Sequence, residues 1–419
     1  MADWLPWLFG GALAFFAMGW LVARIDIKQL LLESRALPQS YFRGLNFLLN
    51  EQQDKAIEAF IEVTKANPEA VELQFALGSL FRRRGEVDRA IRVHQDLSER
   101  PDLGAEKRTA ALLELAMDYQ KAGLLDHAEQ ILVNVAARAA GNEIQQRETL
   151  TLLKQIYEQE RDWRKAIAVA GRLESGVGGG RPEGRQETAN FHCELAVEAH
   201  ADGSDASAYL DAALAANPLC VRANLLRGEW LAAAGRHTEA IEAWQRIEAQ
   251  NADYVGLMAD QLLASYVALD RADEGLAVLR RMQEQYPALD MFGALYRATL
   301  EKQGPLAAAS MARVDLKRHP TLVGLDRLFE AEMLAAGEQQ QADLETVKAV
   351  VHAHASRLAV YLCSRCGFKA CQFYWHCPAC GGWETFPPRL TAEYETADRH
   401  LVRAQVEHGS PPPNLPAKP

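Results

Sequence analysis

Small and large residues recur with a period of 34 positions along most of this chain. Each clear unit has a small residue at its eighth position, an alanine at its twentieth and a large residue at its twenty-fourth. These units supply Gly44, Ala56 and Phe60, then Gly78, Ala90 and His94, and later Gly228, Ala240 and Trp244. Such a period indicates a helix pair that buries its apolar face only against neighbouring pairs. We therefore expect a mostly α-helical chain built as a stack of pairs.

This spacing is that of the tetratricopeptide repeat (TPR), and it predicts a TPR α-solenoid over residues 37–350. Small residues at positions eight and twenty let two antiparallel helices approach closely, and the large residue at position twenty-four fills the space between repeats. Gly85, Gly123 and Gly235 fall where the first helix of a pair has to turn, so we expect positive φ there.

A TPR solenoid generally binds a peptide or protein in a groove on its concave face, which the first helix of each pair lines. We expect Tyr41, Phe75 and Arg82 to contribute to such a partner-binding groove. Two alternatives stay open. The array can be a spacer that only positions other parts, and Arg82 can belong to a solvated helix end, where cations favour the helix dipole.

A glycine-rich segment from Ser175 to Gln186 interrupts the repeats. It does not have the features of a phosphate-binding loop, because no Gly-Lys-Ser/Thr follows the glycines and no strand precedes them. We expect a flexible loop between repeats here.

The N-terminal stretch from Trp4 to Ala23 carries no charge and is long enough to cross a bilayer as a helix. A cleaved signal peptide is disfavoured, because no Lys or Arg precedes the apolar run. Basic residues begin only at Arg24, so the N-terminus is expected to be periplasmic and the body cytoplasmic. We expect residues 1–24 to be a single transmembrane helix in a bacterial inner membrane, and residues 25–36 to be a juxtamembrane linker.

Two Cys-x-x-Cys-Gly motifs stand near the C-terminus, with ten residues between their facing cysteines. Four thiolates at this spacing can surround one metal ion tetrahedrally, and so short a segment has little else to hold it folded. The glycines that follow, Gly367 and Gly381, are expected to take positive φ and turn N–H groups toward sulfur. Residues 351–388 are therefore expected to form a rubredoxin-like domain around one iron or zinc ion. The expected ligands are Cys363, Cys366, Cys377 and Cys380.

Three roles of this small domain compete. A structural ribbon docked against the repeats is favoured over an electron carrier, because ten residues leave little insulation around a redox metal. A dithiol oxidoreductase is disfavoured, since no βαβ pattern surrounds either motif. We expect the aromatic residues of the domain to form its core: Phe368, Phe373, Tyr374, Trp375 and Trp383.

The other three of the seven cysteines do not indicate a disulfide framework, because the total is odd. Cys193 and Cys220 lie in helical patterns and are expected to be buried as small apolar residues. Cys371 and His376 lie beside the metal motifs, but four cysteines already complete a tetrahedral shell.

Composition and motifs exclude several classes of function. A formal net charge of −11 disfavours nucleic acid as a partner, because binding to phosphates needs clustered Lys and Arg. We find no catalytic triad, metalloprotease motif or paired acidic motif in a suitable context, so we expect no enzymatic activity. Residues 389–419 are rich in proline near their end and are expected to be a disordered tail.

The order of these parts resembles the lipopolysaccharide assembly protein B (LapB) family of Gram-negative bacteria. The resemblance covers nearly the whole chain up to about Pro388. It is sharpest at GLNFLLNEQQDKA (44–56), RGEVDRAI (84–91) and YWHCPAC (374–380). The tail after Pro388 departs from the shorter end expected of the family.

The resemblance implies a non-enzymatic adaptor at the inner membrane. Its partners would be an FtsH-type membrane AAA+ protease, the lipid A pathway deacetylase as its client, other lipopolysaccharide assembly proteins and an inner-membrane regulator. By this resemblance, the family's metal ligands correspond to Cys363, Cys366, Cys377 and Cys380. Two alternatives remain: a generic TPR assembly factor for another envelope complex, and a redox protein that uses an iron site.

Overall fold

The computed structural model describes residues 39–50, 52–66, 70–138, 142–175, 182–286, 291–318, 320–356 and 361–388. The expected membrane span, the juxtamembrane linker and the C-terminal tail lie outside these ranges. None of the helices within them is long and apolar enough to cross a membrane. The chain divides into two compact units, Met1–Gly179 and Gly180–Pro419.

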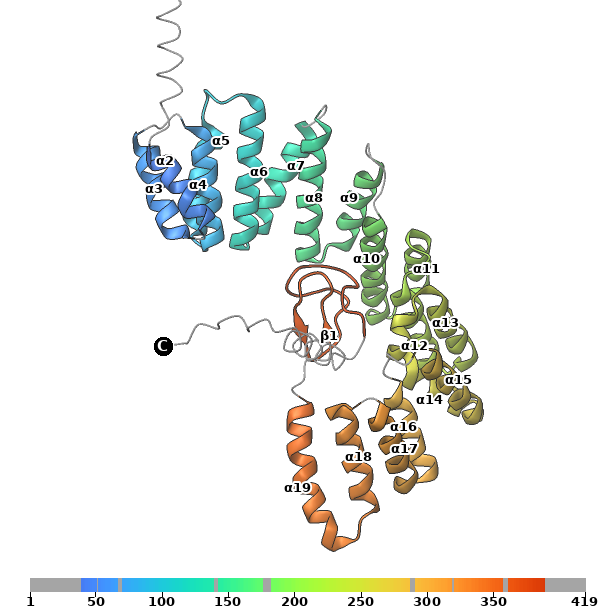
Figure 1. Ribbon diagram of the computed structural model, residues 1–419. Helices are drawn as coiled ribbons and strands as arrows, with labels where there is room; N and C mark the ends of the chain where they lie inside the picture. Colours follow the sequence, from blue (N-terminus) through green and yellow to red (C-terminus); the bar gives the residue numbers. More distant parts are fainter. Residues whose placement is uncertain are drawn as a thin grey trace, which may run out of the picture. The chain divides into compact units, whose positions relative to one another are not determined.

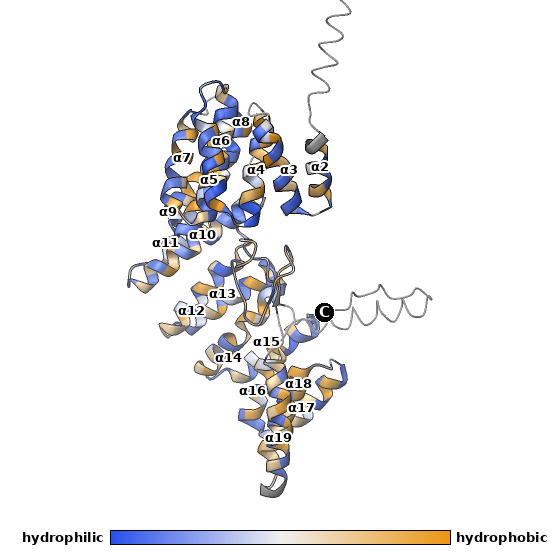
Figure 2. Ribbon diagram, turned by 90° about the vertical axis from the view of Figure 1, so that its left-hand side faces the viewer, coloured by the Kyte–Doolittle hydropathy of each residue, from blue (hydrophilic) through white to orange (hydrophobic). Residues whose placement is uncertain are grey.

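Helices that follow one another in sequence pack together in the first unit (Figure 1). The described helices are α2 (Gln39–Leu49), α3 (Gln53–Ala66), α4 (Val71–Arg84), α5 (Val87–Glu99), α6 (Ala105–Ala122), α7 (Leu125–Arg138), α8 (Glu143–Glu160) and α9 (Trp163–Ser175). Figure 2 shows hydrophilic and hydrophobic residues mixed along these helices, as expected of amphipathic helices with one buried face.

The second unit continues with further helix pairs and ends in a small β-ribbon. Its helices are α10 (Pro182–Ala201), α11 (Ser207–Ala216), α12 (Val221–Ala233), α13 (His237–Gln250), the 3₁₀ helix η1 (Ala252–Met258), α14 (Ala259–Ala268), α15 (Ala272–Gln285), α16 (Phe292–Gln303), α17 (Pro305–Arg318), α18 (Leu322–Ala335) and α19 (Glu338–Ala355). The expected TPR α-solenoid is confirmed.

The packing rule read from the repeat period is also confirmed. A Cβ atom at Gly78 would overlap the His94 imidazole, and one at Gly228 would overlap the Trp244 indole. The alanines at the twentieth position are completely buried in five units: Ala56, Ala90, Ala128, Ala166 and Ala240. Glycine at position eight is therefore what allows a large side chain to lie directly against the first helix.

The expected helix turns are confirmed at Gly85, Gly123 and Gly235, whose φ angles are 86°, 77° and 76°. The corresponding turn after α8 uses Arg161, with φ 59°. The loop expected from Ser175 to Gln186 is wrong at its end, because α10 already begins at Pro182. Proline suits the first turn of a helix, where its missing N–H has no intrahelical partner.

The ribbon, residues 361–388, is built from two short strands and two Cys-x-x-Cys-Gly turns, here called the first knuckle (363–367) and the second knuckle (377–381). β1 (Tyr361–Leu362) pairs antiparallel with β2 (Lys369–Ala370), with Tyr361 opposite Ala370. A single antiparallel bridge joins His376 to Trp383 in the second half. The first knuckle lies between the two strands, and the second lies within the bridge.

Candidate metal centre

Four cysteine sulfurs converge in the ribbon. The Sγ atoms of Cys363, Cys366, Cys377 and Cys380 all lie within 4.8 Å of one another. The Cys363–Cys380 and Cys366–Cys377 pairs are each separated by 3.8 Å. A metal ion with four sulfurs at about 2.3 Å places those sulfurs about 3.8 Å apart, so the arrangement fits one tetrahedral ion.

The two knuckles repeat the same backbone geometry. Gly367 N donates to Cys363 O, and Gly381 N donates to Cys377 O, both at 2.9 Å. The two glycines have φ angles of 74° and 65°, which confirms the expected left-handed turns. Backbone N–H groups face the sulfurs in both knuckles, from Arg365 and Cys366 to Cys363 Sγ and from Ala379 and Cys380 to Cys377 Sγ.

The surroundings of Cys363 favour its thiolate form. Burial raises the pKa of Cys363, but hydrogen bonding with Thr385 and with the backbone outweighs it and lowers the pKa to about 6. The pKa values of Cys366, Cys377 and Cys380 are raised instead. The Thr385 Oγ1 atom lies 3.3 Å from Cys363 Sγ. Metal ions bind cysteine as the thiolate, so among the four cysteines the surroundings of Cys363 favour a bound cation most.

One face of the ribbon docks on helices of the second unit, beside α10 in Figure 1. Glu384 is the polar centre of this contact, and its carboxylate accepts hydrogen bonds from Asn190 Nδ2 at 2.8 Å and Gln186 Nε2 at 2.9 Å. Its carbonyl oxygen accepts a bond of 3.2 Å from the Tyr254 hydroxyl on η1. Burial raises the pKa of Glu384 and of Tyr254.

Aromatic residues surround that polar centre. The Arg222 guanidinium of α12 lies 5.7 Å from the Trp375 ring centre and 5.8 Å from that of Trp383. Tyr254 stacks on Trp375 with an interplanar angle of 6°, and Phe191 meets Trp383 edge-on. The docked face therefore combines aromatic packing, cation–π contacts and partly buried hydrogen bonds.

The expected aromatic core of the ribbon needs correction. Its fully buried aromatic residue is Phe386, which packs with Cys363, Ala370 and Cys377. Phe373 and Tyr374 pack against this cluster, as expected. Trp375 and Trp383 contact the helices instead, and Phe368 is exposed. A ribbon of this size has too little interior for all its aromatic side chains, so several are buried only by docking.

The residues expected in a partner-binding groove lie in the first unit. Tyr41 is in α2, but its side chain lies outside the described set. Phe75 is half-buried, and its ring centre lies 6.1 Å from that of His94. Arg82 is engaged within the repeats rather than unpaired, with salt bridges of 2.6 Å to Glu114 and 2.8 Å to Asp118.

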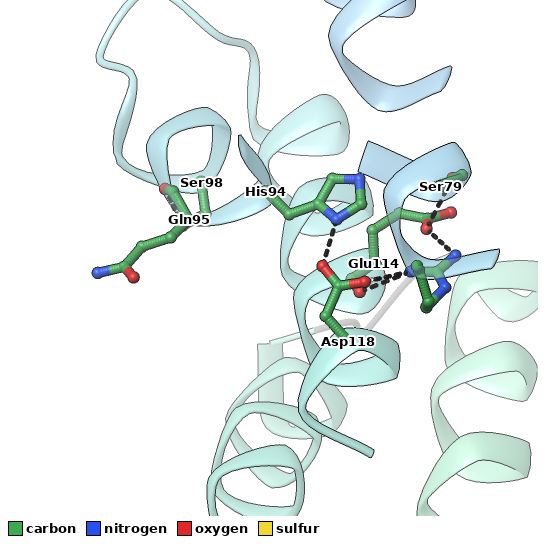
Figure 3. A network of polar contacts seen from close by, with 7 residues as sticks. Ser79, His94, Gln95, Ser98, Glu114 and Asp118 are labelled. Atoms are coloured by element: carbon green, nitrogen blue, oxygen red, sulfur yellow. Dashed lines mark hydrogen bonds and ion pairs between the residues drawn. The ribbon is translucent and has the colours of Figure 1, made fainter. Parts of the chain in front are cut away.

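The salt bridges of Arg82 belong to a buried polar network between α4, α5 and α6. Figure 3 shows the side chains of His94, Glu114 and Asp118 in this network. His94 Nδ1 lies 2.5 Å from Asp118 Oδ2, and both residues are fully buried. Ser79 Oγ donates to Glu114 at 3.3 Å. Although burial opposes it, pairing with Glu114 and Asp118 raises the pKa of Arg82.

Sequence reasoning missed the helix side of the docking contact: Gln186, Asn190, Arg222 and Tyr254. The available signal was indirect. A domain of about thirty residues with two tryptophans beside a glutamate has more large side chains than it can bury alone. Cys193 and Cys220 are fully buried as expected, with their sulfurs in contact at 3.8 Å.

Two family models match the chain. The model described as "Rubredoxin metal binding domain" matches residues 361–388, which are the whole described ribbon. The model described as "Tetratricopeptide repeat" matches residues 43–101 and 196–255.

Curated relatives match almost from end to end. "Lipopolysaccharide assembly protein B" of Escherichia coli (strain K12) is 35% identical over 376 residues, which are 89% of this chain and 95% of the relative. The protein of the same name from Haemophilus influenzae is 28% identical over 392 residues, or 90% and 96%. Among solved structures, the C-terminal part of a TPR repeat-containing protein from Cytophaga hutchinsonii is 14% identical with a TM-score of 0.41, covering 61% of this chain and 99% of that one.

Proposed function

The chain belongs to the lipopolysaccharide assembly protein B family, and on this premise we propose that it is a non-enzymatic adaptor for lipopolysaccharide assembly. The observation that carries the proposal is the match to curated relatives along both the TPR helices and the ribbon. TPR solenoids present extended surfaces for proteins, which suits an adaptor.

The mechanism that we propose is local concentration at a membrane. Residues 1–24 would anchor the chain in the bacterial inner membrane, with the N-terminus in the periplasm and the repeats in the cytoplasm. An FtsH-type AAA+ protease is confined to the same surface. A client held by the repeats, the deacetylase that commits precursors to lipid A, then meets the protease at a high effective concentration.

Further partners fit the same adaptor. Other lipopolysaccharide assembly proteins would gather on the repeats, and an inner-membrane regulator would oppose the adaptor. Tyr41, Phe75 and Arg82 lie on first helices of the two N-terminal repeats and remain our candidates for client contacts. The pairing of Arg82 with Glu114 and Asp118 would then hold its guanidinium in place at that surface.

The ribbon has a structural role in this proposal. Cys363, Cys366, Cys377 and Cys380 would hold one iron or zinc ion, which ties the two knuckles together. The chain's own residues then do the rest, since Glu384 and Trp383 attach the ribbon to α10 and Arg222 of α12.

The test is purification of the tagged full-length protein from membranes in mild detergent, with mass spectrometry of the proteins that accompany it. Recovery of an FtsH-type protease together with lipid A biosynthesis proteins is the expected result. Recovery of redox enzymes, or of another envelope complex without the protease, would contradict the proposal. A chain without residues 1–24 should keep its helical circular dichroism but lose the protease, because the shared surface is gone.

A further inference from the structure

Residues 382–385, here called the bridging segment, hold the two knuckles together on one side. Cys377 N donates to Gly382 O at 2.8 Å, within the second knuckle. Ser364 N, in the first knuckle, donates to Thr385 O at 2.8 Å. The path of this short segment therefore sets where the two pairs of sulfurs stand relative to each other.

The other side of the bridging segment faces the helices. The Glu384 carboxylate accepts bonds from Gln186 and Asn190 on α10, and its carbonyl oxygen accepts a bond from Tyr254 on η1. The Trp383 ring meets Phe191 of α10 edge-on at 5.9 Å. The helices thus contact Trp383 and Glu384, which lie between the two residues whose carbonyl oxygens bond the knuckles.

A stack of rings leads from α12 to a sulfur ligand. The Arg222 cation faces Trp383, and Trp383 stacks on His376 with ring centres 4.4 Å apart. His376 directly precedes Cys377 in the chain. The rings of Trp383 and His376 therefore lie between Arg222 and the backbone next to a cysteine of the cluster.

The backbone conformation of Glu384 is held by contacts with the ribbon and by contacts with the helices. Its φ angle is 53°, in the left-handed region that residues with a side chain rarely adopt. Such a conformation persists only where the surroundings determine it fully. Glu384 N donates to Trp375 O at 2.7 Å on the ribbon side, while the three helix donors fix the carboxylate and the carbonyl.

We propose that Arg222, Asn190 and Gln186 are positioning residues of the metal centre. By docking the bridging segment they hold the knuckles in the arrangement that binds metal, so that metal binding and docking stabilise each other. Such coupling is reciprocal: what docking adds to metal affinity, the metal adds to docking. The inference rests on the proposed binding of a metal ion by the four cysteines and on no protein partner.

The first test measures metal release from the full-length protein in detergent, loaded with Zn²⁺, after addition of excess chromogenic chelator. Arg222→Met should release zinc about tenfold faster than the wild type, the size of change usual for residues that support metal ligands. Arg227→Met is the matched control on the same helix, because Arg227 pairs with Asp211 and has no contact with the ribbon among the described residues. It should release zinc at the wild-type rate.

A second readout separates coupling from simple damage to the fold. Thermal unfolding of the helices is followed by circular dichroism with and without zinc, in the wild type and in Asn190→Ala, a smaller change that leaves the Gln186 donor in place. Coupling predicts that zinc raises the midpoint less in the variant than in the wild type. Arg222→Lys keeps a cation near the indoles, so it should release zinc more slowly than Arg222→Met but faster than the wild type.

The outcomes distinguish the inference from the metal site itself. A wild-type protein that holds no zinc would refute the proposed metal centre. The coupling would be overturned if the wild type holds zinc but Arg222→Met releases it at the wild-type rate and zinc raises the midpoint of Asn190→Ala as much as that of the wild type. The metal centre would then still stand.

Discussion

The Asn190 amide of α10 donates a hydrogen bond of 2.8 Å to the carboxylate of Glu384, 194 residues further along the chain. This bond joins the first helix of the second unit to the last described segment. Glu384 is half-buried there with a raised pKa, so the contact between ribbon and helices is sensitive to protonation.

The pH dependence of docking follows from the direction of that shift. Burial raises the pKa of Glu384, although Asn190, Gln186 and Arg222 oppose it. Because the folded state binds this proton more tightly than the unfolded state, its contribution to stability is complete below the unfolded pKa and is lost as pH rises through the folded pKa. We predict that, as pH rises over that range, the thermal midpoint of the wild type falls relative to the midpoint of Glu384→Gln.

The measurement is thermal unfolding of both proteins at matched pH values at which metal content stays constant. A midpoint difference between them that does not change with pH would contradict the prediction. A wild-type midpoint that rises relative to that of Glu384→Gln as pH increases would also contradict it, because the carboxylate form would then be the favoured one.

Loss of one cluster cysteine should remove the metal and undock the ribbon. We predict that Cys363→Ser loses its metal, since structural tetrahedral sites of this kind supply a binding free energy of about 10–16 kcal/mol that a single lost thiolate strongly reduces. Undocking would expose Trp375 and Trp383, which increases tryptophan fluorescence quenching by iodide. The control is Cys371→Ser, an exposed cysteine of the same ribbon outside the cluster, which should keep metal and fluorescence unchanged.

The tight contact between Gly78 and His94 should make the glycine irreplaceable. We predict that Gly78→Ala lowers the free energy of unfolding by about 1–3 kcal/mol, because the added methyl group has to displace the buried imidazole. Gly171→Ala is the matched control in a helix of the same unit, with open space around the added methyl group. It should stabilise by about 0.5–1 kcal/mol. Urea denaturation measures both, and equal effects would contradict the packing argument.

The network around Asp118 should be strongly stabilising. Asp118→Asn leaves the Arg82 guanidinium and His94 without their shared carboxylate, and removing one partner of a buried ion pair costs about 3–5 kcal/mol. Asp54→Asn removes an exposed partner of Arg84 and should change stability little. Urea midpoints at low and high salt provide the check. An Asp118→Asn effect as small as that of Asp54→Asn would refute the role of the network.

The repeat period was enough to predict the helix pairs because each pair contacts mainly its sequence neighbours. Ala128 and Ala166 are buried where the period places them, and Gly123 takes the left-handed turn. The positive φ angles of Gly367 and Gly381 were also predictable, because a local turn fixes their conformation. Arg161 shows the limit: the repeat requires the turn even where no glycine marks it.

The docking contact was not predictable in the same way. Asn190 lies in α10 and Arg222 in α12, and the sequence of these helices does not show which distant segment will cover them. Gln186 was assigned to a loop because the glycines before it dominated the local signal, although α10 begins at Pro182. Contacts across almost two hundred residues leave no periodic trace in a single sequence.

The most direct test of the proposed adaptor is the lifetime of the lipid A pathway deacetylase after its synthesis is stopped. It is measured in cells that contain the wild-type chain, in cells that lack it and in cells that carry Cys363→Ser. The account predicts that the deacetylase is degraded rapidly only with the wild-type chain, and persists in the other two. A deacetylase lifetime that is the same with and without the chain would contradict the account.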